Sequence, residues 1–389
     1  MAQIRITPLD SSLRLDSQIG AEVSLHKSMP LLDPNALSSA DKTTLRAALY
    51  EHNVLVIRDQ QGIDPAVLPQ IGKLFDDTAC DIHSGGRDAV RDPKNILAAN
   101  RSARIPDAPQ VSVIGQGDFR NYRGIDELAL RHLNHTEFHN TPLSDEDLAA
   151  SYTRPYRWHM DAPLYETLPG RVTTLHCIET PSAQDQKIRF EDGEELAIAA
   201  GATAFFSGAR NFQLLDPNEQ EFALNTTVQY APRAYEWIRD CKASNDGLTI
   251  ASVGLEKGER ELQDWTWDRV HSFPMVWRNH GNGQPHLQIL GCCVYSLTTR
   301  DPKTGSISKI EDLMKAREIC HRLQRKVYRP ENIYAHRWRR GDLVVFYNQG
   351  VLHSITGQLD GRDKRLFWQC SMASGTPPVG YGEVKYEQQ

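Results

Sequence analysis

The sequence predicts a mainly β protein with flanking helices, arranged as a sandwich or a barrel, and two observations lead to this fold class. Five segments rich in β-branched or aromatic residues occur between residues 171 and 373, and Gly, Pro or Asp bounds most of them. Only three segments show a helical pattern. Many strands with few helices are typical of sandwiches and barrels. Since no linker is visible, we expect a single domain over residues 1–389.

The first expected elements lie between residues 41 and 77. Residues 41–52 have the apolar spacing of an amphipathic helix, and residues 53–59 have the apolar run of a buried strand. A second helix is expected over residues 66–77, despite Pro69. Residues 80–157 are polar, rich in Gly, Asp, Asn and His, and only weakly periodic. We expect this stretch to be an irregular insertion that covers the substrate site, because long ordered loops are often functional.

The second half of the chain supplies most of the expected strands. They lie at residues 171–179, 202–208, 286–295, 342–348 and 365–373. One long helix is expected over residues 308–328.

The composition indicates a soluble globular protein and argues against several kinds of partner. The chain has 389 residues, of which 40% are hydrophobic and 24% charged, enough apolar material for a large core. Its net charge of −6 gives no reason to expect a nucleic acid or an anionic membrane as a partner. No stretch has the apolar length of a membrane span, and the N-terminus has no apolar signal core. Seven cysteines with one close pair predict no disulfide framework, so a cytoplasmic location is expected.

A candidate metal-binding pair lies in the segment RPYRWHMDAPLYETLP, residues 154–169. In an extended segment His159 and Asp161 point to the same side and can bind one ion. Imidazole with carboxylate suits Fe(II), Mn(II) or Zn(II). The pair alone is weak evidence, because roughly one such pair is expected by chance among short motifs.

A third ligand and a cation are expected near the C-terminus. His353 follows a strong strand, and Asp360-Gly361 has the sequence of a hairpin turn before the strand that opens with Arg365. Such a hairpin would place Arg365 beside the strand of His353, about 7–13 Å away. A metal-bound 2-oxo acid leaves a distal carboxylate several ångströms from the metal, and a guanidinium is its natural partner.

These motifs resemble those of the Fe(II)/2-oxoglutarate-dependent dioxygenases of the taurine dioxygenase superfamily. The resemblance covers most of the chain and includes LRAALYEHNVLVIRDQQ, RPYRWHMDAPLYETLPGRVTTLHCIETP and RWRRGDLVVFYNQGVLHSITGQLDGRDKRLFWQC. The segment YRWHMDAPLY is most similar to the fungal xanthine dioxygenase branch.

The resemblance implies a double-stranded β-helix (jelly-roll) core and a complete catalytic site. His159, Asp161 and His353 would bind Fe(II), Arg365 would bind the distal carboxylate of 2-oxoglutarate, and Thr203 would help to bind this cosubstrate. With O2, such an enzyme oxidises a small-molecule substrate, usually by hydroxylation, and releases succinate and CO2.

The resemblance also implies residues that contact the substrate. The candidates are Gln110, Arg131, Glu146, Asp147, Gln369 and Ser371. Ser371 stands where the xanthine branch has asparagine, and the loss of an amide argues against xanthine itself. Glu146 and Asp147 also fit a solvated acidic turn.

Several alternatives remain open at this point. Within the superfamily, the substrate could instead be a sulfonate or an aryloxy acid, with Arg131 as the cation that binds it. The same three ligands could serve a zinc hydrolase, although no general base is evident beside them. A cupin-like metal-binding module without catalysis would leave Arg365 without a role. The oligomeric state is not predicted.

Overall fold

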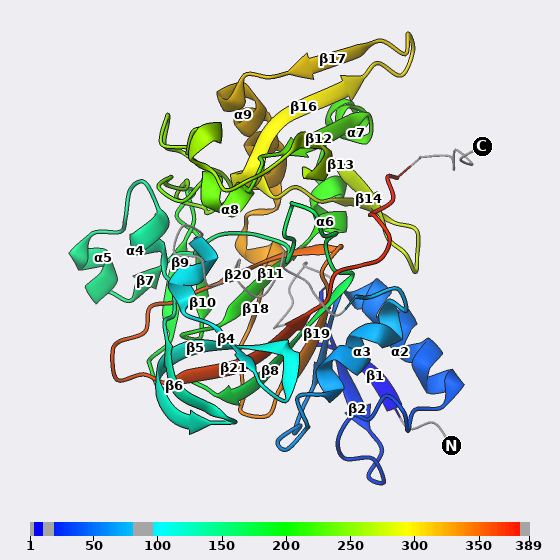
Figure 1. Cartoon of the computed structure of the whole chain (residues 1–389), viewed down its shortest axis with the longest axis vertical. Coiled ribbons are helices and arrows are strands. Elements are labelled where there is room, and N and C mark those ends of the chain that lie inside the picture. Colours follow the sequence, from blue (N-terminus) through cyan, green and yellow to red (C-terminus); the bar gives the residue numbers. More distant parts are fainter. Residues whose placement is uncertain (1–3, 11–18, 81–95, 382–389) are drawn as a thin grey trace.

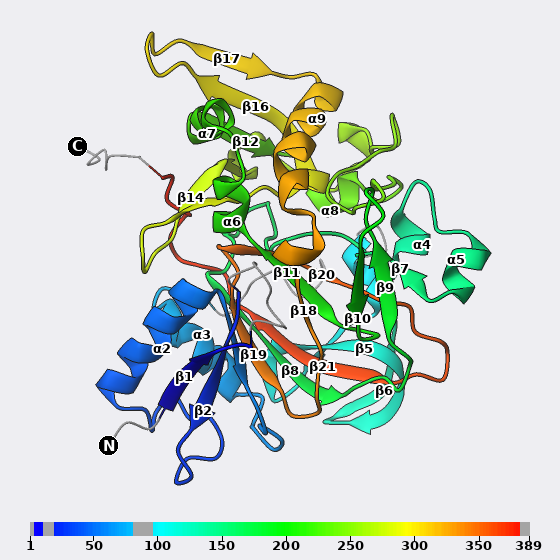
Figure 2. The same ribbon diagram turned by 180° about the vertical axis from the view of Figure 1, so that it is seen from behind.

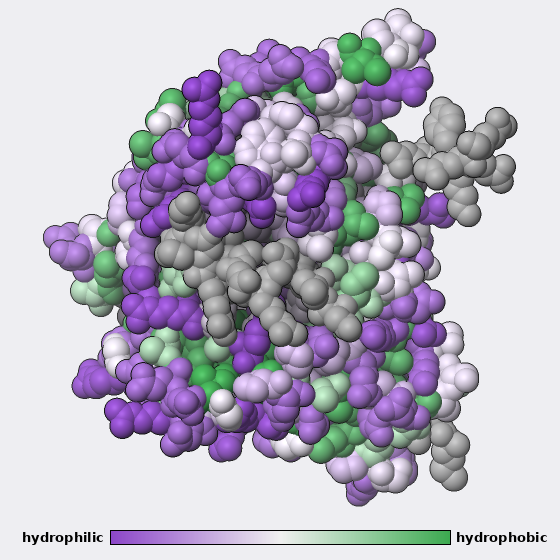
Figure 3. Space-filling view, in the orientation of Figure 1, coloured by the Kyte–Doolittle hydropathy of each residue, from purple (hydrophilic) through white to green (hydrophobic). Residues whose placement is uncertain are grey.

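The computed structural model describes residues 4–10, 19–80 and 96–381. Strands account for 33% and helices for 23% of the structure, so the expected mainly β class is confirmed. Among the described residues, none of the helices combines the length and the apolar character that a membrane span requires. On the face shown in Figure 3, hydrophilic residues predominate and hydrophobic ones occur in small groups.

The largest sheet has nine strands and joins the two ends of the chain (Figure 1). Strands from the C-terminal part of the chain lie in it beside strands from the first half. Among the described strands of this sheet, only those at residues 21–25 and 54–57 pair in parallel. In spatial order the strands are β1 (Ile4–Pro8), β2 (Ala21–Leu25), β3 (Val54–Ile57), β19 (Leu343–Tyr347), β8 (Val172–Glu179), β21 (Arg365–Ser371), β5 (Ala108–Tyr122) and β4 (Ala103–Ile105), while β6 (Ile125–Leu130) pairs with β5.

A smaller sheet of three strands lies next to the large one (Figure 2). Its order is β18 (Tyr334–His336), β11 (Thr203–Ser207) and β20 (Val351–Ile355). Phe205 of β11 packs in one buried cluster with Phe346 of β19 and Phe367 of β21. The two sheets therefore share a core, and this core supports the site described below.

Helices cover the outer parts of the sheets. Helix α2 (Ser39–His52) packs on β1, β3 and β19, and helix α3 (Val67–Phe75), next to α2 in Figure 1, packs on β8, β21 and β5. The Ser38 side chain caps α2, and Asn53 ends it in a left-handed conformation with φ of 60°. Both helices and the buried strand β3 agree with the elements expected for this part of the sequence.

A third layer of elements is built around helix α9 (Leu313–Gln324), which packs on β16. Its sheet contains β13 (Ser272–Pro274), β12 (Thr226–Tyr230), β16 (Val294–Arg300) and β17 (Ile307–Ile310). The remaining helices and strands are α4 (His135–Phe138), α5 (Asp145–Ala149), β7 (Tyr152–Thr153), β9 (Gln186–Arg189), β10 (Glu195–Ile198), α6 (Gly208–Gln213), α7 (Pro217–Leu224), α8 (Ala234–Trp237), β14 (Val276–Arg278) and β15 (Pro285–Leu287).

The segment 80–157 differs from the expected irregular insertion. Residues 81–95 lie outside the described part, but residues 103–130 form β4, β5 and β6, and β5 pairs with β21 in the large sheet. In β5, Val111, Val113 and Gly115 are buried in alternation. The sequence signal was weak because glycines occupy positions 115 and 117, where larger apolar side chains would have marked the strand.

Two other elements have different boundaries from those expected. The strand expected at 286–295 is interrupted by a 3-10 turn at Gly291–Cys293, where a Cβ at Gly291 would lie 2.1 Å from the carbonyl oxygen of Leu248. The helix expected from residue 308 begins only at Leu313, because the Asp312 carboxylate caps it by accepting from the backbone N–H of Lys315.

Candidate active site

The two predicted histidine ligands lie directly opposite each other on paired backbone segments. His159 N donates to His353 O at 2.9 Å, and His353 N donates to His159 O at 2.8 Å. This pairing brings the two imidazole rings to a centroid separation of 4.1 Å. Asp161, two residues after His159 on the extended segment, projects to the same side.

The three side chains form a site of the right size for one metal ion. Asp161 Oδ1 lies 3.8 Å from His159 Nε2 and 3.7 Å from His353 Nε2. Ligand atoms about 2.1 Å from one ion can lie at most about 4.2 Å apart, so these distances fit a shared ion. Within the described ranges, this is the one cluster of three or more such side chains that could hold a metal.

Both histidines have the protonation state that a metal ligand requires. His159 Nδ1 lies 3.0 Å from the carbonyl oxygen of Arg157, and since a carbonyl only accepts, Nδ1 carries the proton and Nε2 is free to bind a metal. Burial, together with the charges of His353 and Arg157, holds the pKa of His159 well below its usual range. Burial also lowers the pKa of His353. Both imidazoles are therefore neutral at neutral pH, as metal coordination requires.

The two carboxylate oxygens of Asp161 have different surroundings. Oδ1 faces the histidines, whereas Oδ2 accepts hydrogen bonds from the Thr173 hydroxyl at 2.8 Å and from the Gln369 side-chain amide at 3.0 Å. Ser371 Oγ lies 2.9 Å from Thr173 Oγ1. Because Thr173 gives its one hydroxyl hydrogen to the carboxylate, Ser371 donates to Thr173. This arrangement turns one oxygen of Asp161 toward the metal and holds the other away from it.

Asn348 fixes the backbone of the same residue. Its side-chain oxygen accepts from Asp161 N at 2.7 Å, and its amide nitrogen donates to Asp161 O at 2.9 Å and to Gly170 O at 2.7 Å. Neither Asn348 nor Thr173 was predicted from the sequence. Both act through strand pairings that join distant segments, and no local pattern marks them.

Arg365 is a buried cation without a carboxylate partner among the described residues. It is 2% exposed, its Nε donates to Gly201 O at 3.2 Å, and its guanidinium lies 3.9 Å from the ring centroid of Phe367. Burial lowers its pKa to about 10, so it remains charged at neutral pH. A planar cation held in this way is suited to a carboxylate of a bound ligand.

Arg365 does not reach the site through the expected hairpin, and that prediction is wrong. Strand β20, which carries His353, pairs with β11, whereas β21, which carries Arg365, pairs with β8 and β5. The residues between them cross from the small sheet to the large one. Arg365 therefore approaches the metal ligands across the space between the two sheets.

A cavity of about 120 Å³ lies between the sheets and connects these groups. The two histidines, Thr203, Arg365 and Gln369 line it. The Thr203 hydroxyl accepts from Trp338 Nε1 at 3.1 Å, which fixes its direction. The predicted insertion contributes the opposite wall, through Ile96, Leu97, Asn100, Arg131, His132 and Leu133.

Residues 6–371 match the model of the taurine catabolism dioxygenase TauD, TfdA family. The chain belongs to this family. It is accordingly a 2-oxoglutarate-dependent dioxygenase, an oxidoreductase that uses Fe(II), 2-oxoglutarate and O2 on a small-molecule substrate. The resemblance stated from the sequence is thereby confirmed, and the zinc hydrolase and the non-catalytic module are set aside.

Curated relatives of this dioxygenase cover most of its length. It is 38% identical over 354 residues to the alpha-ketoglutarate-dependent xanthine dioxygenase xanA of Emericella nidulans, which covers 90% of this chain and 93% of the relative. It is 38% identical over 355 residues to the xanthine dioxygenase xan1 of Schizosaccharomyces pombe, with 90% and 85% covered. The dioxygenase bsc9 of Alternaria brassicicola is 32% identical, with 83% of each chain covered.

Solved structures of low identity share the fold of this dioxygenase. A taurine dioxygenase from Burkholderia xenovorans superposes with a TM-score of 0.56 at 14% identity, covering 97% of this chain and 91% of the other. AAD-2 in complex with Mn(II) and N-oxalylglycine superposes with a TM-score of 0.52 at 15% identity, covering 97% and 99%.

The candidate substrate residues of the dioxygenase fall into two groups. Arg131 and Gln369 line the cavity. The other four are not among its described lining residues. Glu146 is exposed on α5, and Asp147 of the same helix pairs with Arg189 at 3.2 Å. Gln110 lies near the start of β5, and Ser371 is bonded to Thr173.

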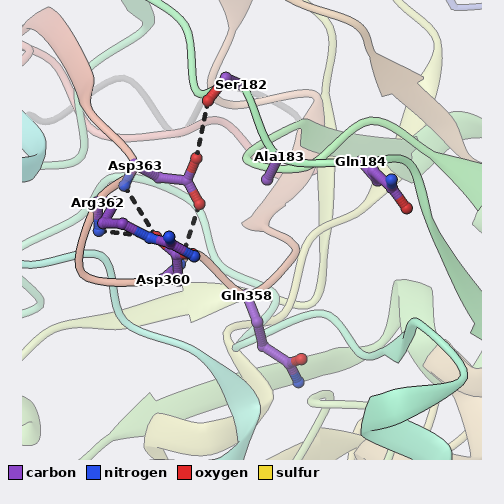
Figure 4. A pocket seen from close by; sticks show the side chains of 7 residues that line it. All are labelled: Ser182, Ala183, Gln184, Gln358, Asp360, Arg362 and Asp363. Atoms are coloured by element: carbon purple, nitrogen blue, oxygen red, sulfur yellow. Dashed lines mark hydrogen bonds and ion pairs between the residues drawn. The ribbon is translucent and has the colours of Figure 1, made fainter.

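A second hollow lies at the loop between β20 and β21 (Figure 4). Asp363 accepts hydrogen bonds from the Ser182 hydroxyl at 3.3 Å and from Asp360 N at 3.0 Å, while Arg362 pairs with Asp360 at 3.2 Å. These carboxylates already have partners within their own loop, and no metal ligand of the dioxygenase lines this hollow.

Proposed function

We propose that this dioxygenase oxidises a xanthine-like purine. The observation that carries the proposal is the 38% identity, over 90% of the chain, to two proteins named xanthine dioxygenases. The sequence-based objection to xanthine rested on Ser371. In the structure the Ser371 hydroxyl is bonded to Thr173, and Ser371 is not among the described residues that line the cavity, which weakens this objection.

In this proposal His159, Asp161 and His353 hold Fe(II), while Arg365 and Thr203 bind 2-oxoglutarate. The donor set fits the metal, since two neutral imidazoles and one carboxylate oxygen converge on a single point. O2 is the oxidant: bound Fe(II) would activate it, and its four electrons would come from 2-oxoglutarate, which is converted to succinate and CO2, and from the substrate. Arg365 fixes the distal end of 2-oxoglutarate, so that its 2-oxo end is directed toward the metal ligands.

Arg131 and Gln369 are the proposed substrate contacts at the cavity wall. Gln369 donates through its amide nitrogen to Asp161, which leaves its amide oxygen to accept from a ring N–H of the purine. Gln110, Glu146 and Asp147 act at most indirectly, because they lie outside the described wall. Leu133 and Leu175 limit the access of water to the reacting groups.

The proposal extends to the architecture and the location of the protein. We infer a jelly-roll core over a single domain, residues 1–389, supported by the shared core of the two sheets and by a large sheet that combines both ends of the chain. The segment 80–157 covers the substrate, supported by its contribution to the cavity wall. Seven free cysteines support a cytoplasmic location.

The test is succinate formation with Fe(II), 2-oxoglutarate and a panel of xanthine, hypoxanthine, taurine and aryloxy acids. We expect succinate with xanthine in stoichiometric amounts to an oxidised purine, and none with His159→Ala. Arg365→Met should raise the KM for 2-oxoglutarate about 100-fold, since a charge-assisted pair is lost. Coupled oxidation of taurine or an aryloxy acid, with no turnover of any purine, would overturn the proposed substrate.

A further inference from the structure

Arg157 is a second buried cation at the cavity, and no carboxylate among the described residues pairs with it. The residue is 3% exposed and lines the cavity, and its Nε and Nη1 atoms have no hydrogen-bond partner in the described part of the chain. Its side chain is hydrogen-bonded to Tyr235, its guanidinium lies 5.1 Å from the ring centroid of that residue, and the Tyr235 hydroxyl donates to Ala162 O. The other groups beside it are Tyr156, Cys292 and Cys293, which are neutral at neutral pH.

A purely structural arginine in this chain looks different. Three arginines are buried among the described residues: Arg157, Arg317 and Arg365. Arg317 also has two nitrogens without hydrogen-bond partners, Nε and Nη2, and lies against the ring of Trp237, but it pairs with Glu256 at 2.5 Å. The two without a carboxylate partner are the two that line the cavity. An unpaired buried charge destabilises a protein, so a pair of them at one cavity indicates ligand groups that complete them.

Arg157 is well placed to contact a substrate beside the metal. It lies two residues before His159 on the same extended segment, and its carbonyl oxygen holds the Nδ1 proton of that ligand. Residues two apart on such a segment share a side. The backbone of Arg157 therefore orients a metal ligand, while its side chain adds positive charge near the same cavity.

The charges of the site favour an anionic substrate. Among the described residues of the site, Asp161 contributes one negative charge, Arg157 and Arg365 contribute two positive ones, and Arg131 is paired with Glu137 at 2.6 Å. A divalent cation adds two positive charges, and 2-oxoglutarate brings two negative ones. One positive charge then remains, which complements a monoanion.

We infer that Arg157 is a specificity-determining residue that binds the oxygen-rich edge of the substrate in its monoanionic form. The inference rests on the proposed function, because an oxopurine carries carbonyl oxygens and loses a ring N–H proton near neutral pH. The guanidinium fork donates to a carbonyl oxygen and to the neighbouring deprotonated nitrogen, as it does to a carboxylate.

The test compares Arg157→Met and Arg157→Lys with wild type, at saturating Fe(II). We expect Arg157→Met to raise the KM for xanthine at least tenfold and to leave the KM for 2-oxoglutarate within about twofold, with partial recovery in Arg157→Lys. Xanthines N-methylated so that they cannot ionise should be affected less by the substitution. Binding of xanthine to the Mn(II)–2-oxoglutarate form, measured by calorimetry, should weaken by the same factor without any turnover.

Thermal unfolding of the ligand-free protein separates this role from a structural one. Arg157→Met should keep or raise the Tm, because it removes an uncompensated buried charge, whereas Arg317→Met should lower it by leaving Glu256 unpaired. A lowered Tm in Arg157→Met with an unchanged KM for xanthine would overturn the inference alone. Absence of purine turnover by the wild-type protein would instead overturn the proposed function, and this inference with it.

Discussion

At the scale of single residues, the direction of the Asp161 carboxylate depends on Thr173. The Thr173 hydroxyl and the Gln369 amide both donate to Oδ2, and Ser371 in turn supports Thr173. Hydrogen bonds of this kind around a metal ligand set its orientation and the affinity of the site.

We therefore expect Thr173→Val to weaken metal binding about tenfold or more, because the substitution keeps the shape of the side chain and removes the hydroxyl donor. The measurement is anaerobic titration of the metal-free protein with Fe(II), with Co(II) absorption as a second readout. Thr174→Val is the matched control, since this adjacent buried threonine donates to Cys370 O instead. Equal affinities in the two variants would show that Thr173 does not orient the ligand.

The sequence was sufficient to predict the candidate metal ligands and the candidate cosubstrate cation, and insufficient for the residues that support them. His159, Asp161, His353 and Arg365 could be predicted because imidazole, carboxylate and guanidinium suit iron and 2-oxoglutarate. Thr173 acts only because β8 and β21 pair in the register that sets it opposite Ser371. Such a register depends on the packing of the whole sheet and cannot be read from a local pattern.

At the scale of elements, the turn before β11 holds Arg365 in place. Gly201 has φ of +70°, accepts from Arg365 Nε at 3.2 Å, and a Cβ there would lie 3.1 Å from Arg365 Cδ. The turn thus needs glycine for its backbone and for the close approach of this side chain.

Gly201→Ala should lower the free energy of unfolding by about 1–2 kcal/mol, the usual cost of a left-handed alanine, and should also raise the KM for 2-oxoglutarate several-fold. Gly193→Ala is the matched control: its φ is +87° and no atom lies within 4 Å of the added Cβ. It should show the stability loss alone. The same KM in both variants would contradict the role of the turn in positioning Arg365.

Helix α9 is joined to the loop before β13 by a partly buried ion pair. His321 Nε2 lies 2.6 Å from Asp246 Oδ2. Burial acts to lower the pKa of His321. The hydrogen bond with Asp246 and the negative charge of Asp246 outweigh burial, so the pKa is raised above its usual 6.5. Arg325 and Glu191 have smaller effects that oppose each other. The pKa of Asp246 is lowered: burial would raise it, but the hydrogen bond with His321, the charge of His321 and the hydrogen bonds from Ser244 and Leu248 together outweigh burial.

The pair should therefore make stability depend on pH. A raised folded-state pKa contributes stability that is complete below pH 6.5 and is lost as the pH rises through the folded-state value. Between pH 6 and pH 9, wild type should lose on the order of 1 kcal/mol more than His321→Gln, measured by urea unfolding at each pH. Parallel pH dependences of the two proteins would mean that the ion pair contributes nothing.

The elements that the sequence misassigned share a physical cause. A hairpin was expected before Arg365 and an irregular insertion at 80–157. In both places a strand pairs with a partner far away in sequence, since β21 pairs with β5 and β8. Local composition predicts that a strand or a turn exists, as it did for β8, β11 and β19, but the choice of partner is made by burial in the assembled sheets.

At the scale of the whole molecule, the metal ligands join the two sheets. His353 belongs to the small sheet, and His159 is paired with it. Asp161 is held by Thr173 and Gln369, which belong to the large sheet. A bound ion therefore adds a further link between segments that side-chain packing and hydrogen bonds such as Arg365 Nε to Gly201 O already join.

Metal binding should accordingly stabilise the whole fold. Mn(II) at about 100 times its Kd should add about 2.7 kcal/mol to the free energy of unfolding and raise the Tm by several degrees. 2-Oxoglutarate should raise the Tm of the wild-type protein further. It should not raise the Tm of Arg365→Met, because the distal carboxylate of 2-oxoglutarate would lack a cation on β21. Thermal unfolding followed by circular dichroism, with and without a chelator, measures both steps.

His159→Ala is the control, since a protein with two of the three ligands should lose most of the Mn(II) shift. A shift of equal size in that variant would place the stabilising ion elsewhere, and the two sheets would then be held together by their hydrogen bonds and by packing around Phe205, Phe346 and Phe367, without the ion.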